Sequence, residues 1–183
     1  MASNPLWFFA PLQIATTVVA GVNAGASSLQ SPLTWPMLQD VDVPPHYTGR
    51  QTEQLLHCSE HIFPPLNAFC TLGNLVMTGF AYFHPTAPGS DKLSLTALAA
   101  ALHIGTTAYT LGIMAPYNRR LVALSKEMNR RVEKGEAETE GQKKAVKAYR
   151  DAQTSWKKLN YVRGVIMIGA TAASAIATSM SIV

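Results

Sequence analysis

The sequence has few charged residues, and they are unevenly placed. Asp, Glu, Lys and Arg make up 14% of the 183 residues and hydrophobic residues make up 48%, whereas an ordinary soluble domain has about 25% charged residues. No Lys or Arg precedes Arg50, and twelve of the fifteen basic residues lie within 116–159. This pattern excludes a uniformly solvated globule, a disordered chain and a nucleic-acid-binding protein with a dispersed basic face.

Cysteine and the common cofactor motifs are also scarce or missing. Cys58 and Cys70 are the two cysteines, too few for a disulfide framework or a thiolate metal site. The sequence contains no Gly-rich nucleotide-binding loop and no obvious haem-binding arrangement. His57 and His61 are four residues apart, a spacing that suits a shared metal on a helix, but no clear third ligand accompanies them. We therefore predict neither a metal site nor a resident cofactor.

What the sequence has instead is long uncharged runs. A helix needs about 20 apolar residues to cross a bilayer, and runs of this length predict spans at residues 6–29, 62–83, 93–115 and 160–183. The first run has no positive segment before it and is too long for a signal peptide, so we expect it to be retained. The sequence predicts an all-α protein, an integral membrane four-helix bundle that forms a single domain over residues 1–183.

The basic residues orient the predicted spans. Segments 30–60 and 116–159 together contain thirteen Lys and Arg, whereas Lys92 is the one basic residue of the other side. The positive-inside rule places both segments in the cytosol, and both termini and residues 84–92 across the membrane. We expect an endoplasmic reticulum or other endomembrane location, with the basic segment near anionic headgroups of the bilayer and no nucleic-acid partner.

The two cytosolic segments differ in their patterns. Segment 116–159 carries apolar residues at helical intervals on both sides of a break at 135–141, which predicts a helical hairpin extending the third and fourth spans, with Thr139 as a cap. Segment 30–60 contains four prolines between residues 32 and 45, which predicts an irregular loop. Such a loop is either a lid or binding element, or a plain connector.

Polar side chains line each predicted span at intervals of three and four residues, which places them on one stripe of a helix. Because polar groups cost free energy against lipid tails, we expect all four stripes to face inward and to give the bundle a polar interior. The Ser and Thr members can also serve simply as contacts between helices. The stripes are Gln13, Thr16, Ala20, Asn23 and Ser27; Glu60, Pro64, Asn67, Thr71, Asn74 and Thr78; His103, Thr107, Thr110, Met114 and Tyr117; and Asn160, Arg163, Met167, Thr171, Ser174, Thr178 and Ser181.

One histidine lies deep within a predicted span. His103 is about ten residues into the third span, which places it about 15 Å along the helix and near the bilayer midplane. An ionisable residue at that depth is a candidate functional residue. The alternative is a neutral histidine that is hydrogen-bonded to a neighbouring helix.

Two short motifs flank the hairpin. Pro116-Tyr117-Asn118-Arg119-Arg120-Leu121 closes the third span, and Trp156-Lys157-Lys158-Leu159-Asn160-Tyr161-Val162-Arg163 opens the fourth. This pair resembles the anthrone oxygenase-like family of small four-span membrane proteins, which includes fungal emodin-anthrone and noranthrone oxygenases. In that family Pro-x-Asn-x-x-Leu and Trp-x-x-x-Asn-x-x-Arg elements occupy these places. The resemblance extends over nearly the whole chain in span order, although Tyr117 stands where a smaller residue such as Thr is expected.

The resemblance implies a membrane-bound oxygenase that converts a polyketide anthrone, an aromatic small molecule, to the anthraquinone with molecular oxygen. That reaction can run without a cofactor, because a base can remove a proton from the acidic ring methylene and the resulting anion can react with oxygen. The alternative is a non-enzymatic membrane carrier or binding scaffold for a hydrophobic metabolite. The small-residue motif at Gly21–Gly25 can pair helices within one chain or between two copies, so the sequence allows either a monomer or a homo-oligomer.

An oxygenase of this kind needs a base, donors for a developing oxyanion and an aromatic binding surface. The candidate bases are His103 and His61, of which we favour His103 because a dry site keeps its imidazole neutral. The resemblance marks Pro116, Asn118, Leu121, Trp156, Asn160 and Arg163 without saying which act chemically. The candidate oxyanion donors are Arg163, Asn118 and Arg119, and the candidate substrate contacts are Trp35, Asp40, His57, Asn67, Asn74, Tyr109, Trp156 and Asn160.

Overall fold

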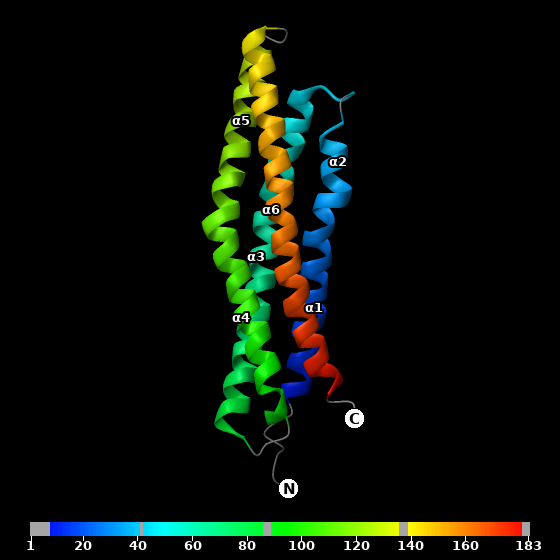
Figure 1. Ribbon diagram of the computed structural model, residues 1–183, viewed down its shortest axis with the longest axis vertical. Helices are drawn as coiled ribbons and strands as arrows, with labels where there is room; N and C mark the ends of the chain where they lie inside the picture. Colours follow the sequence, from blue (N-terminus) through cyan, green and yellow to red (C-terminus); the bar gives the residue numbers. More distant parts are fainter. Residues whose placement is uncertain (1–7, 41, 86–88, 136–138, 181–183) are drawn as a thin grey trace. The chain divides into compact units, whose positions relative to one another are not determined.

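The computed structural model describes residues 8–40, 42–85, 89–135 and 139–180, and within these ranges every regular element is a helix (Figure 1). The all-α prediction is therefore confirmed. Some predicted features lie outside the described residues: the ends of the first and fourth spans at residues 6, 7 and 181–183, which include Ser181 of the fourth stripe, and residues 136–138 of the hairpin turn. The elements are α1 (Phe9–Leu29), the π-helical turn η1 (Gln30–Thr34), α2 (Trp35–Leu38), α3 (Pro45–Phe83), the 3-10 turn η2 (Ser90–Lys92), α4 (Leu93–Tyr109), the π-helical turn η3 (Thr110–Met114), α5 (Ala115–Glu133) and α6 (Glu140–Ser179).

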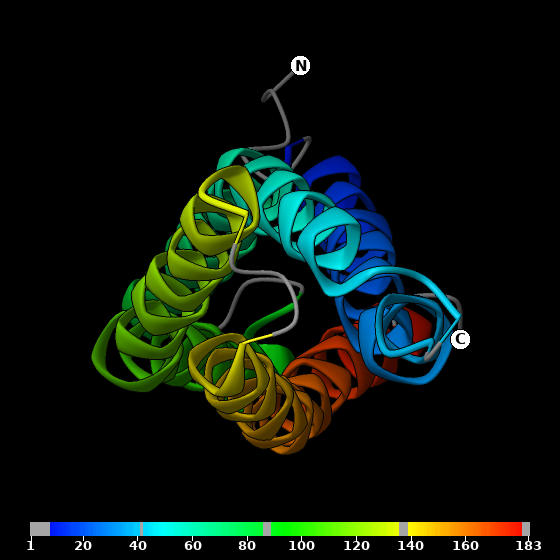
Figure 2. The same ribbon diagram turned by 90° about the horizontal axis from the view of Figure 1, so that it is seen from above.

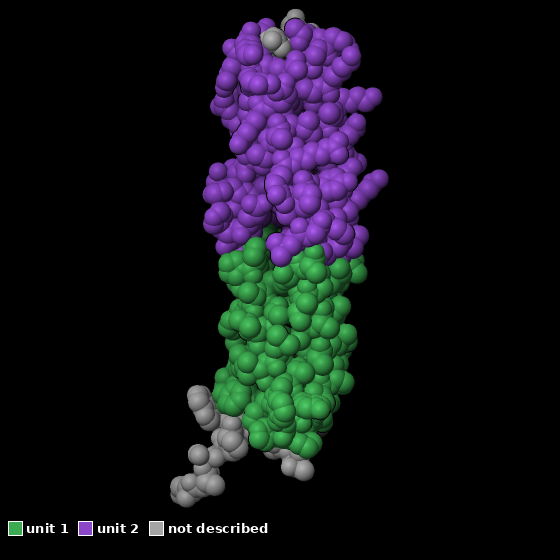
Figure 3. Space-filling model, turned by 90° about the vertical axis from the view of Figure 1, so that its left-hand side faces the viewer, with its two compact units in different colours: residues 1–27, 63–108, 164–183 green, residues 28–62, 109–163 purple. Residues whose placement is uncertain are grey.

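The chain divides into two compact units (Figure 3). Unit 1 is drawn from residues 1–27, 63–108 and 164–183, and unit 2 from residues 28–62 and 109–163. The long helices α3 and α6 contribute residues to both units. The boundaries lie within a few residues of the boundaries predicted between the four spans and the two cytosolic segments, except at the end of the third span.

Unit 1 is a bundle of α1, α4 and the corresponding parts of α3 and α6 (Figures 1 and 2). The Cys70 thiol donates to the Thr16 carbonyl oxygen, with 3.6 Å between the heavy atoms, and joins α3 to α1. The hydroxyls of Thr17 and Thr178 lie 3.0 Å apart and join α1 to α6. Small side chains let the helices approach closely; the buried alanines of this interior are Ala20, Ala24, Ala81, Ala99, Ala100, Ala170, Ala173 and Ala177.

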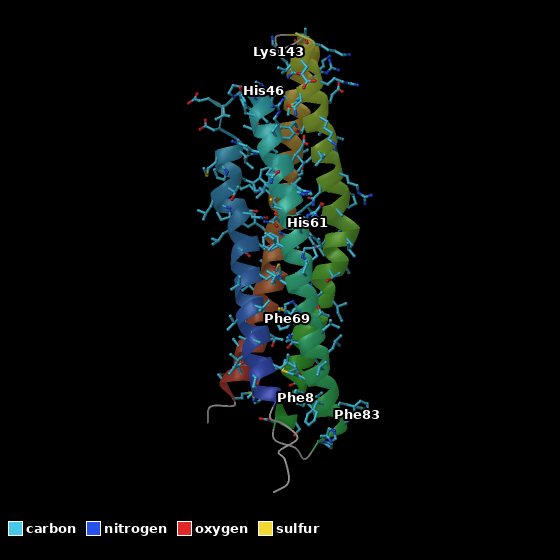
Figure 4. The ribbon with its side chains drawn as sticks, turned by 180° about the vertical axis from the view of Figure 1, so that it is seen from behind. Phe8, His46, His61, Phe69, Phe83 and Lys143 are labelled. Carbon is cyan, nitrogen blue, oxygen red and sulfur yellow. The ribbon has the colours of Figure 1, made fainter. Side chains whose placement is uncertain are left out.

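The outer surface of unit 1 is apolar, which associates the protein with a membrane. Three helical segments are long and apolar enough to cross a bilayer, Phe9–Leu38, Ser90–Glu133 and Glu140–Ser179. The helix α3 is not among them, although its second half exposes Leu72, Leu75, Val76 and the labelled Phe69 and Phe83 (Figure 4). The crossing at residues 62–83 therefore stays a prediction.

Unit 2 has a conventional apolar core. The rings of Trp35 and Trp156 lie 4.7 Å apart between centroids and pack with Leu121 and Met128 of α5. Within this core the buried Tyr149 hydroxyl lies 2.6 Å from Thr52 Oγ1 and accepts a hydrogen bond from Gln153 Nε2 at 2.9 Å. Burial raises the pKa of Tyr149 to about 12, so this phenol stays neutral at physiological pH.

The helices of the predicted hairpin form as expected. Each helix buries two of its predicted apolar residues, Leu121 and Met128 on α5 and Tyr149 and Trp156 on α6. The other apolar residues on these faces are half-buried: Leu124, Val132, Val146 and Leu159. The predicted cap is also present, because the Gln142 backbone N–H donates to Thr139 Oγ1 at 3.2 Å. The hydroxyl thus satisfies a backbone donor of the first turn of α6, as a helix cap does.

The expectation of an irregular loop over residues 30–60 is wrong. The described residues of this segment are helical except for 39, 40 and 42–44, and α3 starts at Pro45, 17 residues before the predicted span. Proline disrupts a helix interior, but at the first turn its missing N–H would be unpaired anyway. Pro36 lies in the first turn of α2 and Pro45 begins α3, so these prolines start helices instead of preventing them.

Each π-helical turn ends two residues before a proline. The turn η1 precedes Pro36 and η3 precedes Pro116. A proline ring clashes with the carbonyl four residues earlier and cannot donate to it, and a wider turn relieves both problems. The chain therefore continues as a helix through both prolines, with one additional residue in the turn.

The predicted polar stripes face inward in most places, with three corrections. All five residues of the first stripe are buried, and the described members of the fourth are buried or half-buried. On the second stripe Glu60 and Pro64 are exposed. On the third stripe Thr107 is exposed and Thr106 is buried in its place. His103 and Thr106 are three residues apart in the regular helix α4, so the stripe takes a spacing of three there instead of the predicted four, and η3 interrupts the regular helix only after residue 109.

Candidate functional site

A group of polar contacts between helices α3 and α4 surrounds His103 in unit 1. This side chain is 1% exposed, and its Nδ1 lies 2.8 Å from Asn67 Oδ1. Because an amide oxygen can only accept, Nδ1 carries the proton. In the neutral ring Nε2 is then a bare acceptor, and it has no hydrogen-bond partner among the described residues. His103 is therefore a buried imidazole held in the tautomer that leaves Nε2 available as a base.

Asn67 fixes this arrangement from α3. Its Nδ2 donates to the His103 carbonyl oxygen at 2.9 Å and to Thr107 Oγ1 at 2.8 Å. These two bonds define which end of the amide is nitrogen, and so they determine that the oxygen faces the imidazole. The structure therefore brings together two predicted site residues, His103 and Asn67. The hydrogen bond to a neighbouring helix fits both interpretations of His103, a functional base and a structural neutral histidine.

The two motifs that flank the hairpin meet in unit 2. Trp156 Nε1 of α6 donates to Asn118 Oδ1 of α5 at 2.6 Å. Asn118 Nδ2 in turn donates to Glu60 Oε1 of α3 at 3.1 Å. Both ends of the Asn118 amide are thus engaged by protein groups. Asn118 connects three helices, and an oxyanion would have to displace one of these contacts to reach it.

The second motif also binds the segment that follows α1. Asn160 Nδ2 donates to Ser31 Oγ at 2.9 Å, and Ser31 Oγ donates to the Lys157 carbonyl oxygen at 3.4 Å. Next to it, Tyr109 donates to the Leu159 carbonyl oxygen at 3.1 Å. The Tyr109 phenol also interacts electrostatically with the Arg163 guanidinium, which is buried. Unit 2 thus gathers an aromatic pair, a phenol and a guanidinium.

Other predicted site residues take no part in these hydrogen bonds among the described residues. His57 and His61 are both exposed, with His61 Nδ1 donating to the His57 carbonyl oxygen at 2.8 Å. Arg119 and Asp40 are also exposed. Asn74 is buried in unit 1, seven residues beyond Asn67, and donates to the carbonyl oxygen of Cys70 in its own helix. Within the described residues, no group of three or more His, Cys, Asp or Glu side chains is arranged to hold a metal ion.

Two members of the unit 2 network were missed as site residues. Glu60 belongs to a predicted polar stripe and lies beside His61, so its position on a helix was predictable but its contact with Asn118 was not. Ser31 lies in the segment taken as an irregular loop, and no pattern in the sequence indicated its bond to Asn160. Both contacts depend on which helices pack together, which local spacing does not specify.

Comparison with known proteins supplies the family. The family model described as anthrone oxygenase matches residues 53–173, about two thirds of the chain, including both motifs, His103 and Asn67. No curated protein and no solved structure matches significantly. The family match supports an anthrone-oxidising role and hence an oxidoreductase. This chain belongs to the anthrone oxygenase family.

Proposed function

We propose that this protein is a membrane-bound oxygenase that converts a polyketide anthrone to the anthraquinone with molecular oxygen and without a resident cofactor. One observation carries the proposal: a buried imidazole, His103, is held with its Nδ1 proton on Asn67 and its Nε2 without a partner among the described residues. A general base must be neutral and must have a free lone pair that can reach the substrate. The family match supports the choice of an anthrone as substrate.

In the proposed mechanism His103 Nε2 removes a proton from the ring methylene of the anthrone. The carbanion is delocalised onto the carbonyl oxygen and passes one electron to oxygen. Recombination of the two radicals forms a carbon–oxygen bond and a peroxide anion on that carbon, and His103 returns its proton to this anion to give the hydroperoxide. Loss of the second methylene proton with cleavage of the oxygen–oxygen bond then releases water and leaves a carbonyl. One methylene and one oxygen molecule are thus converted to one carbonyl and one water.

A histidine suits both proton transfers because its ordinary pKa lies near neutral pH. Asn67 assists by keeping the imidazole in one tautomer and orientation, as an acceptor on the second ring nitrogen does in other base-dependent enzymes. A buried site also keeps water from the carbanion before oxygen reaches it.

In unit 2, taken by itself, the buried Arg163 guanidinium lies beside Tyr109 and can attract an anionic group, while the paired rings of Trp35 and Trp156 are buried against each other in the core of that unit. Asn118 holds Trp156 in place and is a positioning residue. The proposed partners are the aromatic substrate and the lipid bilayer, in an endomembrane with the hairpin of α5 and α6 in the cytosol.

Turnover tests this function. Membranes containing the protein, supplied with emodin anthrone and oxygen, are expected to form the quinone faster than membranes without it, because anthrones also oxidise slowly in solution. Equal rates would contradict the proposal. If the protein-containing membranes then retained more anthrone without oxidising it, the protein would be a carrier or binding scaffold instead.

A further inference from the structure

A second buried polar side chain in unit 1 has no explanation in the fold. Asn23 of α1 is 0% exposed, and neither its Nδ2 nor its Oδ1 has a hydrogen-bond partner among the described residues. Leaving a buried donor or acceptor unpaired costs about 1–3 kcal/mol, and buried polar groups in native proteins are nearly always paired. An amide with both ends unpaired therefore indicates a ligand that supplies both an acceptor and a donor.

Contacts between neighbouring helices give the depth of Asn23 in unit 1. A Cβ on Gly21 would lie 3.9 Å from Thr171, and one on Gly169 would lie 3.5 Å from Leu102. Because α1 and α6 run in opposite directions, the residue two positions after Gly21 is level with the residue two positions before Thr171. Asn23 is therefore level with Gly169, and the Thr17–Thr178 contact extends this level to Ala172, so Asn23 lies within about one helical turn of Leu102 along the bundle. His103 is the next residue, about 1.5 Å further along α4.

The two side chains also face the same interior. The helix α1 contacts α3 and α6, and α4 contacts the same two helices, so α1 and α4 occupy opposite corners of the bundle (Figure 2). Asn23 and His103 are both buried, and so both point inward from these corners. One layer of unit 1 thus contains three unpartnered polar atoms: Asn23 Nδ2, a donor, and Asn23 Oδ1 and His103 Nε2, both acceptors.

An anthrone that carries a hydroxyl beside its carbonyl matches these three atoms. Its carbonyl oxygen accepts from an amide N–H, its hydroxyl donates to an amide oxygen, and its methylene gives a proton to a base. We propose that Asn23 binds the carbonyl and the adjacent hydroxyl of such a substrate, in the layer where His103 removes the proton; this inference rests on the proposed function.

Asn23 would then act in catalysis as well as in specificity. When His103 removes the methylene proton, negative charge moves onto the carbonyl oxygen, and a hydrogen bond from Asn23 Nδ2 strengthens as that charge develops. The residue also lies outside the segment that the family model matches, which begins at residue 53. The helix α1 therefore adds to the layer a group that the family match does not account for.

Two substrates and two variants test the assignment. The specificity constant kcat/KM is measured for an anthrone with hydroxyls beside the carbonyl and for unsubstituted anthrone, after subtraction of the rate in empty membranes. The wild type is expected to prefer the hydroxylated substrate. Asn23→Leu, which has nearly the same volume but no hydrogen-bonding atoms, is expected to lower that preference by roughly 10- to 100-fold.

Thr16→Val is the matched control. Thr16 is also buried on α1, and its hydroxyl bonds only to carbonyl oxygens of its own helix, so the preference should not change in this variant. If the Leu variant does not accumulate in membranes, the smaller Asn23→Ser replaces it and should also lower the preference. Protein amount and thermal unfolding are recorded for each variant.

The outcomes separate this inference from the proposed function. An equal loss on both substrates, or a wild type without preference, would show that Asn23 contacts only water or packs the interior, and would overturn the assignment of Asn23 alone. A wild type that oxidises neither substrate would overturn the proposed function and this inference with it.

Discussion

At the scale of single residues, His103 and His61 differ in what surrounds the imidazole. His103 is 1% exposed and bonded through Nδ1 to Asn67, whereas His61 is exposed and bonded to the backbone of its own helix. An exposed imidazole is surrounded by water, while a buried one is kept from it. His103 is therefore the better base for a carbanion that must meet oxygen before water.

His103→Ala is expected to lower turnover by roughly 10² to 10⁴-fold while the protein still accumulates in membranes. His61→Ala should mainly weaken substrate capture, so its effect should appear in KM more than in kcat. Steady-state oxidation of an anthrone by membranes with matched protein content measures both. Near-normal turnover by the His103 variant, together with loss of activity in the His61 variant, would place the chemistry at His61.

Trp156 and Trp35 form a matched pair for measuring the motif hydrogen bond. Both are buried and their rings pack together, but only Trp156 Nε1 has a partner among the described residues, Asn118. Trp156→Phe should therefore lower the free energy of unfolding by about 1–2 kcal/mol more than Trp35→Phe does. Denaturant unfolding in detergent micelles measures the difference. Equal losses would mean that the Asn118 contact adds no stability.

At the scale of helices, periodicity predicted the fold well where one regular helix was enough. The inward stripe of α1 and the buried faces of α5 and α6 follow from spacings of three and four residues. The same reasoning failed at Thr107 because a spacing of three or of four residues after His103 fits a helical stripe, and the regular helix α4 takes the spacing of three, to Thr106. It failed over residues 30–60 because proline frequency does not show whether a proline lies in the interior or the first turn of a helix.

The sequence predicts those site residues whose polar side chains interrupt an apolar helix, because such side chains face the interior of the bundle. His103 and Asn67 were expected on inward stripes, and both are buried there. Their mutual hydrogen bond, and the bonds from Asn118 to Glu60 and from Asn160 to Ser31, join residues of different helices. Such contacts depend on the rotation and register of whole helices, which are set by packing and not by local sequence.

Two glycines of α3 measure how closely that helix packs on α1. A Cβ on Gly73 would overlap the Thr16 side chain, whereas a Cβ on Gly79 would meet no atom within 4 Å. Gly73→Ala should push the two helices apart and lower the free energy of unfolding by about 1–3 kcal/mol. Gly79→Ala should instead raise it by up to about 1 kcal/mol, because alanine favours the helix. Unfolding in detergent measures the change in the free energy of unfolding for each variant. A Gly73→Ala variant that is more stable than the wild type would contradict the close contact.

At the scale of the whole molecule, the distribution of charge predicts topology. Thirteen basic residues fall in the segments assigned to the cytosol, and Lys92 is the one assigned to the other side. In sealed microsomes, a tag inserted between α5 and α6 should be cleaved by added protease, while tags at both termini should be protected. Cleavage of the C-terminal tag before detergent is added would overturn this topology.

Independence from cofactors is also a property of the whole protein. Detergent-purified protein, treated with a chelator and given no flavin or nicotinamide, should still oxidise an anthrone, because the proposed steps need only a base and oxygen. Protein treated with chelator already saturated with metal is the control. Loss of activity on chelation that a single metal restores would identify a metal-dependent oxygenase, with His57 and His61 as the first ligands to test.

The turn η3 has a consequence for how the chain tolerates changes in length. Thr106 of α4 and Met114, Leu121 and Met128 after it are all buried. Thr106 and Met114 are eight residues apart, one more than the seven residues that span about two turns of an α-helix. The wider turn η3 accommodates this extra residue. A chain that lost one residue from 110–114, with Pro116 also replaced by alanine because proline does not fit a regular helix interior, could close the wide turn into a regular helix and keep every buried residue facing inward. A deletion two turns later, inside α5, would turn the charged side chains that follow it toward the core.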